Sequence, residues 1–253
     1  MRALLSVLLS LVLTGCFQIA STITVRPDGS ATIEDRVEMS GFGGDALMDS
    51  EGEGIDKAAL QARAKALGEG VTLVGVKEQD TGYTAIYSVA DVRTLRFTSP
   101  DLDLGEDGDA KTVADESMDL RFEFEDGAPS TLRLVVGDPS DGDAPEAAPD
   151  TLTEAERAEA ERGLGMARAL LGDARISVNV VVEGDIIETD ADYAEGSAVT
   201  VYDVHFDTLF DVIEEHPELM GRDEPPTREI VALIGEREGF RVQSPGTVSV
   251  RFE

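Results

Sequence analysis

Apolar and polar positions alternate along much of the chain in paired segments, which is the pattern of antiparallel hairpins. In residues 17–40, apolar residues recur at every second position on both sides of the turn-forming Pro27-Asp28-Gly29. The pattern returns in residues 71–89, across Asp80-Thr81-Gly82, and in residues 118–136, across Asp126-Gly127. Three hairpins are expected, each with one face buried and one in water.

Other segments have helical periodicity. Residues 55–67 end at Gly68, a helix C-cap, and a longer helix begins at Thr151, which forms a capping box with Glu154, and ends at Gly172. A short helix is predicted at 208–215. The apolar stripes are Ile55, Ala59, Leu60, Ala64 and Leu67 on the first helix and Ala160, Leu164, Ala167 and Leu171 on the longest one.

Further strands are predicted at 176–182 and 199–202, and a last hairpin across Ser244-Pro245-Gly246. Short turns between strands imply antiparallel pairing. We therefore predict an α+β fold, with antiparallel β-hairpins forming one or two sheets and amphipathic helices packed on one face.

Residues 137–150 are rich in Asp, Pro and Gly and form the strongest linker signal. This predicts a signal peptide at 1–15, an N-terminal α+β half at 16–136, an acidic linker at 137–150 and a C-terminal α+β half at 151–253. The alternative is one continuous domain, 16–253.

The first sixteen residues read as a lipoprotein signal peptide. Arg2 is followed by an apolar run over residues 3–13, which is too short to span a bilayer, and then by small residues before Cys16. Cys16 is the one cysteine of the chain, so no disulfide can form within the monomer.

Leu13-Thr14-Gly15-Cys16 resembles the bacterial lipobox. The resemblance implies cleavage before Cys16, a diacylglycerol on its thiol and an N-acyl chain such as palmitate on the new amino group. No other cofactor is expected. If the host is Gram-negative, Phe17 in the place after the cysteine resembles the sorting signature for the outer membrane, facing the periplasm.

Residues 23–33, 87–95, 176–191 and 196–202 together resemble a set of bacterial lipoproteins that includes those with an LppM-type domain. The resemblance implies a mixed sheet-and-helix domain on the cell envelope, with lipid binding as a considered role. It carries over no ligand-binding residue.

The excess of acidic residues limits the kinds of molecule that the protein can bind. The chain has 21 basic and 52 acidic residues and a formal charge of −31. Such a surface repels phosphate backbones and anionic headgroups, so nucleic acid is not expected as a partner and the membrane is reached through the lipid anchor.

Catalytic motifs are missing from the sequence. There is no Gly-x-Ser-x-Gly elbow, no His-Glu-x-x-His and no cysteine pair, and the two histidines are His205 and His216. We therefore expect a non-enzymatic, lipid-anchored envelope domain that binds a ligand or an envelope protein, with an acyl chain between sheet and helices as one candidate. The alternative is an envelope hydrolase that uses unrecognised carboxylates or His205.

The acidic loop at 99–116 suggests calcium, since hard cations take carboxylate oxygens. The EF-hand spacing is not met, because Gly105 stands at the fifth place and Thr112 at the twelfth. A solvated loop is favoured over a calcium-dependent scaffold. The candidate ligands are Asp101, Asp103, Asp107 and Asp109.

Overall fold

The computed structural model describes residues 16–40, 55–97, 119–137, 153–216, 219, 233–234 and 237–253. Their fold is α+β with mostly antiparallel strands, which confirms the predicted class. The strands are β1 (Cys16–Val25), β2 (Ala31–Ser40), β3 (Val71–Gln79), β4 (Gly82–Val89), β5 (Arg96–Phe97), β6 (Leu120–Glu125), β7 (Ser130–Val136), β8 (Arg175–Val182), β9 (Ile186–Thr189), β10 (Ala194–Glu195), β11 (Ala198–His205), β12 (Phe240–Val242) and β13 (Gly246–Phe252). The helices are α3 (Lys57–Leu67), the short 3-10 helix η1 (Val92–Thr94), α4 (Glu154–Leu171) and α5 (Phe206–Glu215).

The larger sheet has eight strands in the order β10–β11–β8–β1–β2–β4–β3, with β12 beside β11. The hairpins predicted at 17–40 and 71–89 form β1–β2 and β3–β4, and β2 pairs with β4. β1 and β8 are parallel, with Ser21 opposite Val178. The prediction of antiparallel pairing rests on short turns between consecutive strands. β1 and β8 are not joined by a turn, so the sequence does not predict their relative direction.

The smaller sheet has five strands in the order β5–β6–β7–β13–β9, and every pair in it is antiparallel. The hairpin predicted at 118–136 supplies β6 and β7, and β6 alternates buried and exposed residues as expected. Both sheets combine strands from before and after residues 138–150, which lie outside the described part. The division into two halves stays a prediction.

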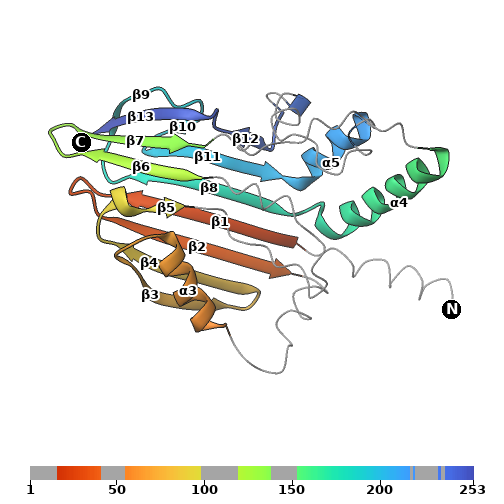
Figure 1. Cartoon of the computed structure of the whole chain (residues 1–253), viewed down its shortest axis with the longest axis horizontal. Helices are drawn as coiled ribbons and strands as arrows, with labels where there is room; N and C mark the ends of the chain where they lie inside the picture. The colour runs from red at the N-terminus through yellow and green to blue at the C-terminus, as the bar shows by residue number, and fades with distance from the viewer. Residues whose placement is uncertain are drawn as a thin grey trace.

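Two elements cover the inner face of the larger sheet. The smaller sheet packs against it, and buried residues of both sheets form one hydrophobic core together with α3. α3 covers the end of the larger sheet that holds β3 and β4, close to β5 (Figure 1). Helices alone were expected as the cover. The second sheet takes most of that role because its own apolar face also needs a partner.

α3 ends at Leu67 as its sequence predicts, but it begins at Lys57, two residues after the predicted start at Ile55. The Asp56 carboxylate accepts hydrogen bonds from the amides of Ala58 and Ala59 at 2.8 and 3.2 Å, and Gly68, with φ of 142°, is the C-cap. Ala59 is exposed, although the helical stripe placed it inside. The buried side chains are Leu60, Ala64 and Leu67.

The chain passes between the two sheets several times, among them from β4 to β5, from β8 to β9, from β9 to β10 and from β12 to β13. β8 leads into β9 through Gly184, and β12 leads into β13 through residues 243–245. The predicted hairpin across Ser244-Pro245-Gly246 is therefore wrong, since β12 pairs with β11 while β13 lies between β7 and β9. Alternation of apolar residues identifies a strand but does not tell which sheet it joins.

α4 and α5 lie together at the end of the molecule where β1 begins (Figure 1). The apolar stripe predicted for α4 is only half-buried, and Met166 is 67% exposed. Arg168 joins the helices: its Nη2 donates to Asp207 and Asp211 at 2.6 Å, and its Nη1 lies 3.0 Å from Glu214. No helix in the described residues is both long and apolar enough to cross a membrane.

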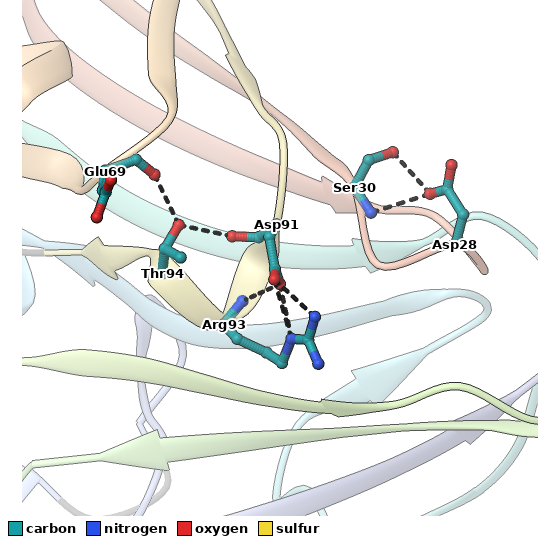
Figure 2. A network of polar contacts seen from close by, with 6 residues as sticks. All are labelled: Asp28, Ser30, Glu69, Asp91, Arg93 and Thr94. Atoms are coloured by element: carbon teal, nitrogen blue, oxygen red, sulfur yellow. Dashed lines mark hydrogen bonds and ion pairs between the residues drawn. The ribbon is translucent and has the colours of Figure 1, made fainter.

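Short turns close the opposite end of the molecule. The Asp28 carboxylate accepts hydrogen bonds from the amide and hydroxyl of Ser30, and Asp91 accepts from the amide and guanidinium of Arg93. These bonds lower the pKa of both carboxyl groups. Each carboxylate is bound within its own turn, so we interpret these polar contacts as stabilising the turns. Figure 2 shows the residues of this network, Asp28, Ser30, Glu69, Asp91, Arg93 and Thr94.

Candidate functional site

Cys16, the predicted lipidation site, is the first residue of β1. It lies in register with Ser40, the last residue of β2, and β1 has an inner position in the larger sheet, between β2 and β8. Leu13, Thr14 and Gly15 lie outside the described residues, as does the rest of the predicted signal peptide. A lipid on Cys16 would be joined to the sheet without an intervening linker.

A buried carboxylate lies on the inner face of the larger sheet. Asp35 stands between Ile33 and Val37 on β2, and its side chain is 6% exposed. Its Oδ1 accepts a hydrogen bond from the Ser21 hydroxyl and its Oδ2 accepts one from Nε of Arg63, each at 2.7 Å. Because Ser21 belongs to β1 and Arg63 to α3, this carboxylate ties the helix to the sheet.

Arg63 lies where α3 meets β5. Its side chain is 20% exposed, and its guanidinium carbon lies 5.8 Å from the centre of the ring of Phe97, a fully buried residue of β5. A cation at this distance from an aromatic face is attracted to it. We call the region lined by Asp35, Arg63, Tyr87 and Phe97 the α3–β5 seam.

Two polar side-chain atoms of the seam are buried: Nη2 of Arg63 and the hydroxyl of Tyr87. Tyr87, on β4, is fully buried. Burial raises the pKa of Tyr87 to about 12, and the charge of Asp35 acts in the same direction. The phenol is therefore a neutral hydrogen-bond donor at neutral pH. Arg63 opposes the rise through its charge and through a side-chain hydrogen bond with the Tyr87 hydroxyl, so the two groups are neighbours in the seam.

The sequence analysis did not single out these residues. A signal existed for two of them: Asp35 interrupts the apolar alternation of β2, and Arg63 falls within the helical stripe between Leu60 and Leu67. Tyr87 lies within the alternating segment 71–89, and nothing in that pattern indicates that its hydroxyl would lie beside a charged pair.

His205, the histidine of the predicted hydrolase alternative, lies at the end of β11 beside Asp203. Its Nε2 lies 3.8 Å from Oδ1 of Asp203, and that carboxylate already accepts two hydrogen bonds from Arg175, at 2.7 and 2.9 Å. The His205 side chain is 44% exposed. His216 follows α5, where its amide donates to the Val212 carbonyl at 2.9 Å. His205 and His216 are therefore the two residues that flank α5, the first as its N-cap and the second as its C-cap.

An open depression of about 680 Å³ lies at the β10–β11–β12 edge of the larger sheet. Arg237, on its wall, is bound to Glu215 at 2.5 and 3.2 Å, and Asp192 accepts from Gln243 at 2.8 Å. Small-molecule sites are more often enclosed and apolar. The depression is lined by Asp192, Tyr193, Ala194, Glu195, Thr200, Arg237, Glu238, Gly239, Phe240 and Arg241.

Within the part of the chain that the structure describes, no three His, Cys, Asp or Glu side chains are grouped so that they could hold a metal ion. The calcium candidates Asp101, Asp103, Asp107 and Asp109 lie outside that part. The calcium hypothesis stays a prediction.

No protein family model and no curated protein matches the chain. Among solved structures, it is similar to the folded domain of the LppM protein of Mycobacterium tuberculosis, determined by NMR. The two share 12% sequence identity over 94% of this chain and 92% of that one, with a TM-score of 0.31. A TM-score this low assigns neither a fold nor a function to this chain.

Proposed function

We propose that the protein is a lipid-anchored lipoprotein of the cell envelope whose folded part binds an acyl ligand and catalyses no reaction. The observation that carries the proposal is the start of β1 at Cys16, directly after the lipobox-like residues 13–15. The interior between the larger sheet and its two covers, the smaller sheet and α3, is made of apolar side chains, and this favours an apolar ligand over a polar one.

The anchor follows from the lipobox-like residues 13–16 and from the start of β1 at Cys16. An acylated Cys16 would hold the α4–α5 end of the molecule at the bilayer, because β1 begins at that end (Figure 1). In a Gram-negative host, Phe17 favours the outer membrane, with the domain in the periplasm.

The anchor is tested by labelling cells that express the full chain or its Cys16→Ser variant with radioactive palmitate. We expect the wild-type protein to take up label and to partition into detergent, and the variant to do neither, because a serine hydroxyl does not replace the thiol as the acceptor of the diacylglycerol group, and the later steps depend on that group. An unlabelled wild-type protein would show that residues 13–16 are not a lipobox.

The ligand is tested by native mass spectrometry of the purified protein before and after organic extraction. We expect an added mass that extraction removes, while the covalent lipid on Cys16 remains and identifies the intact chain. A mass without added ligand in both samples would contradict acyl binding. The domain would then act through a protein partner at its surface.

A further inference from the structure

β3 is the last strand at one end of the larger sheet. It runs over Val71–Gln79 and pairs with β4 on one side. On its other side, no strand of the described residues is paired with it. An open edge of this kind presents backbone N–H and C=O groups with which another extended chain can pair. Val74, at a bulge in β3, is 60% exposed and offers apolar contact at the same edge.

Lysines are concentrated at this edge. The chain has four lysines, and three of them are Lys57 and Lys65 on α3 and Lys77 on β3, all exposed. Residues 55–97 contain six basic and five acidic residues, whereas the whole chain contains 21 and 52. The part of the protein that includes α3 and β3 is therefore close to neutral in a strongly acidic molecule.

The packing of α3 directs two of these lysines toward the edge. The buried residues of α3 face the sheet, and Arg63, on one flank of the helix, reaches Asp35 of β2. β2 lies toward the middle of the sheet, and β3 lies at its end, beyond β4. Lys57 and Lys65 share the opposite flank, because residues four and eight positions apart lie on one side of a helix. That flank is on the side of β3.

Lys77 borders the same edge from the other face of the sheet. It lies opposite Thr84, whereas the residue before it, Val76, lies opposite Ala85, a fully buried residue of the core. Side chains alternate between the two faces along a strand, so Lys77 points away from α3. A strand added beside β3 would therefore have lysines on both of its faces.

These three lysines have no bound carboxylate in the part of the chain that the structure describes. Exposed arginines elsewhere, such as Arg36, Arg121 and Arg251, bind carboxylates of neighbouring residues. Glu78 and Asp80 lie at the turn that follows β3, so they repel an acidic partner at that end. The attraction for an acidic partner is therefore confined to residues 72–77.

Charge and backbone pairing together select the class of partner. A second copy of this chain is disfavoured, because each copy has a formal charge of −31 and two paired β3 edges would bring like charges together. An anionic bilayer supplies negative charge but no strand for the open edge. An extended acidic segment of a polypeptide supplies both carboxylates and backbone groups.

We propose that an acidic, extended segment of a partner protein adds to the larger sheet as a strand beside β3, with its carboxylates on Lys57, Lys65 and Lys77. Lys57 and Lys65 are about 12 Å apart along α3, which is the length of about four strand residues. Two or three alternate acidic residues therefore span both lysines of the helix, and acidic residues on the other face meet Lys77. This inference is independent of acyl binding.

The test uses a synthetic octapeptide with two glutamates on each face of its strand, acetyl-Val-Glu-Thr-Glu-Glu-Thr-Glu-Val-amide. Its binding to the purified full chain is measured by fluorescence anisotropy, beside a control peptide in which glutamine replaces each glutamate. We expect the acidic peptide to bind at least about tenfold more tightly than the control, since each exposed ion pair contributes up to about fivefold. Amide hydrogen exchange in β3 should slow when the acidic peptide is bound.

The variants remove one exposed charge each. Lys57→Gln, Lys65→Gln and Lys77→Gln should each weaken binding of the acidic peptide about two- to fivefold. Arg96→Gln is the matched control, because Arg96 is an exposed cation of β5, on the Arg63 flank of α3. Its effect should stay within about twofold.

Backbone pairing is tested with the same peptide carrying an N-methyl group on each glutamate, which removes donors from both of its edges. We expect the methylated peptide to bind at least about tenfold more weakly. Equal binding of the methylated peptide would show that charge alone attracts the ligand, and this would overturn strand addition. Equal binding of the acidic and glutamine peptides, or lysine variants that match Arg96→Gln, would also overturn the proposal.

Inorganic triphosphate is the last probe, because it carries similar charge without a backbone. Tighter binding of triphosphate than of the peptide would assign the lysines to phosphate groups of a membrane and overturn a polypeptide partner. Each of these outcomes leaves the proposed acyl binding unchanged, since the peptide is not an acyl ligand and the β3 edge lies at the surface.

Discussion

Asp35 and Arg63 form a largely buried ion pair that holds α3 on the larger sheet. Replacing Arg63 with Ala leaves the Asp35 carboxylate buried with Ser21 as its remaining partner. Removing one member of a buried pair typically costs 3–5 kcal/mol. Because Arg63 is partly exposed, we expect the free energy of unfolding to fall by about 3 kcal/mol, measured by urea denaturation.

The matched control is Arg251→Ala. Arg251 pairs with Glu188 at 2.6 Å across exposed positions of β13 and β9, and exposed pairs contribute about 0–1 kcal/mol. Equal losses in the two variants would contradict a special role for the buried pair.

Tyr87 gives a prediction for alkaline pH. Burial raises its pKa from 10.0 to about 12, so between these values the unfolded chain releases the phenolic proton while the folded chain keeps it. The stabilisation by this group is complete below pH 10 and is lost as the pH rises toward 12. Tyr202, whose pKa burial also raises to about 12, adds to the same loss.

The measurement is absorbance at 295 nm against pH for the wild-type protein and Tyr87→Phe. The difference between the curves should rise near pH 12 or at the onset of unfolding, whichever comes first. A difference centred on pH 10 in folded protein would show that the Tyr87 hydroxyl is in contact with water.

At the scale of elements, hairpins were the most predictable part of the fold. Alternating residues and a nearby turn determine a hairpin locally, which is why β1–β2, β3–β4 and β6–β7 were predicted correctly. Pairing between distant strands depends on which faces remain uncovered, and that information is not local. The same limit explains why the seam was not predicted, since Asp35, Arg63 and Tyr87 belong to three elements.

The α4–α5 contact depends on a single cation. Arg168 is bound by Asp207, Asp211 and Glu214, and the half-buried stripe of α4 adds modest apolar contact. We expect Arg168→Gln to speed amide hydrogen exchange in α4 about five- to tenfold with little effect on α3, measured by mass spectrometry.

Arg162→Gln is the control on the same helix, because Nε of Arg162 donates to the carbonyl of Ala158 within α4, and its side chain is bound to no other element among the described residues. Similar exchange in both variants would mean that α4 is held by its apolar stripe.

At the scale of the whole molecule, Gly184 lies at one of the places where the chain passes between the two sheets. Gly184 has φ of 142°, and a Cβ there would collide with the carbonyl oxygen of Glu253. Asp185 and Glu253 also exchange backbone hydrogen bonds of 2.8 and 3.2 Å. We expect Gly184→Ala to lower the free energy of unfolding by at least about 2 kcal/mol, measured by urea denaturation.

Gly163→Ala is the opposite case. Gly163 lies in α4 with nothing within 4 Å of an added Cβ, so alanine should raise stability by up to about 1 kcal/mol. A neutral Gly184→Ala would show that the crossing can relax without cost.

The parallel pairing of β1 with β8 has a consequence for how the chain folds. The three local hairpins can form within microseconds, but Ser21 meets Val178 only after most of the chain has been brought together. Topologies rich in such distant pairings fold in milliseconds to seconds. Until β8 pairs with it, β1 has one edge whose backbone groups have no partner strand. Such an open edge can pair with a strand of another chain. The middle of the larger sheet is therefore the last region to be protected from aggregation.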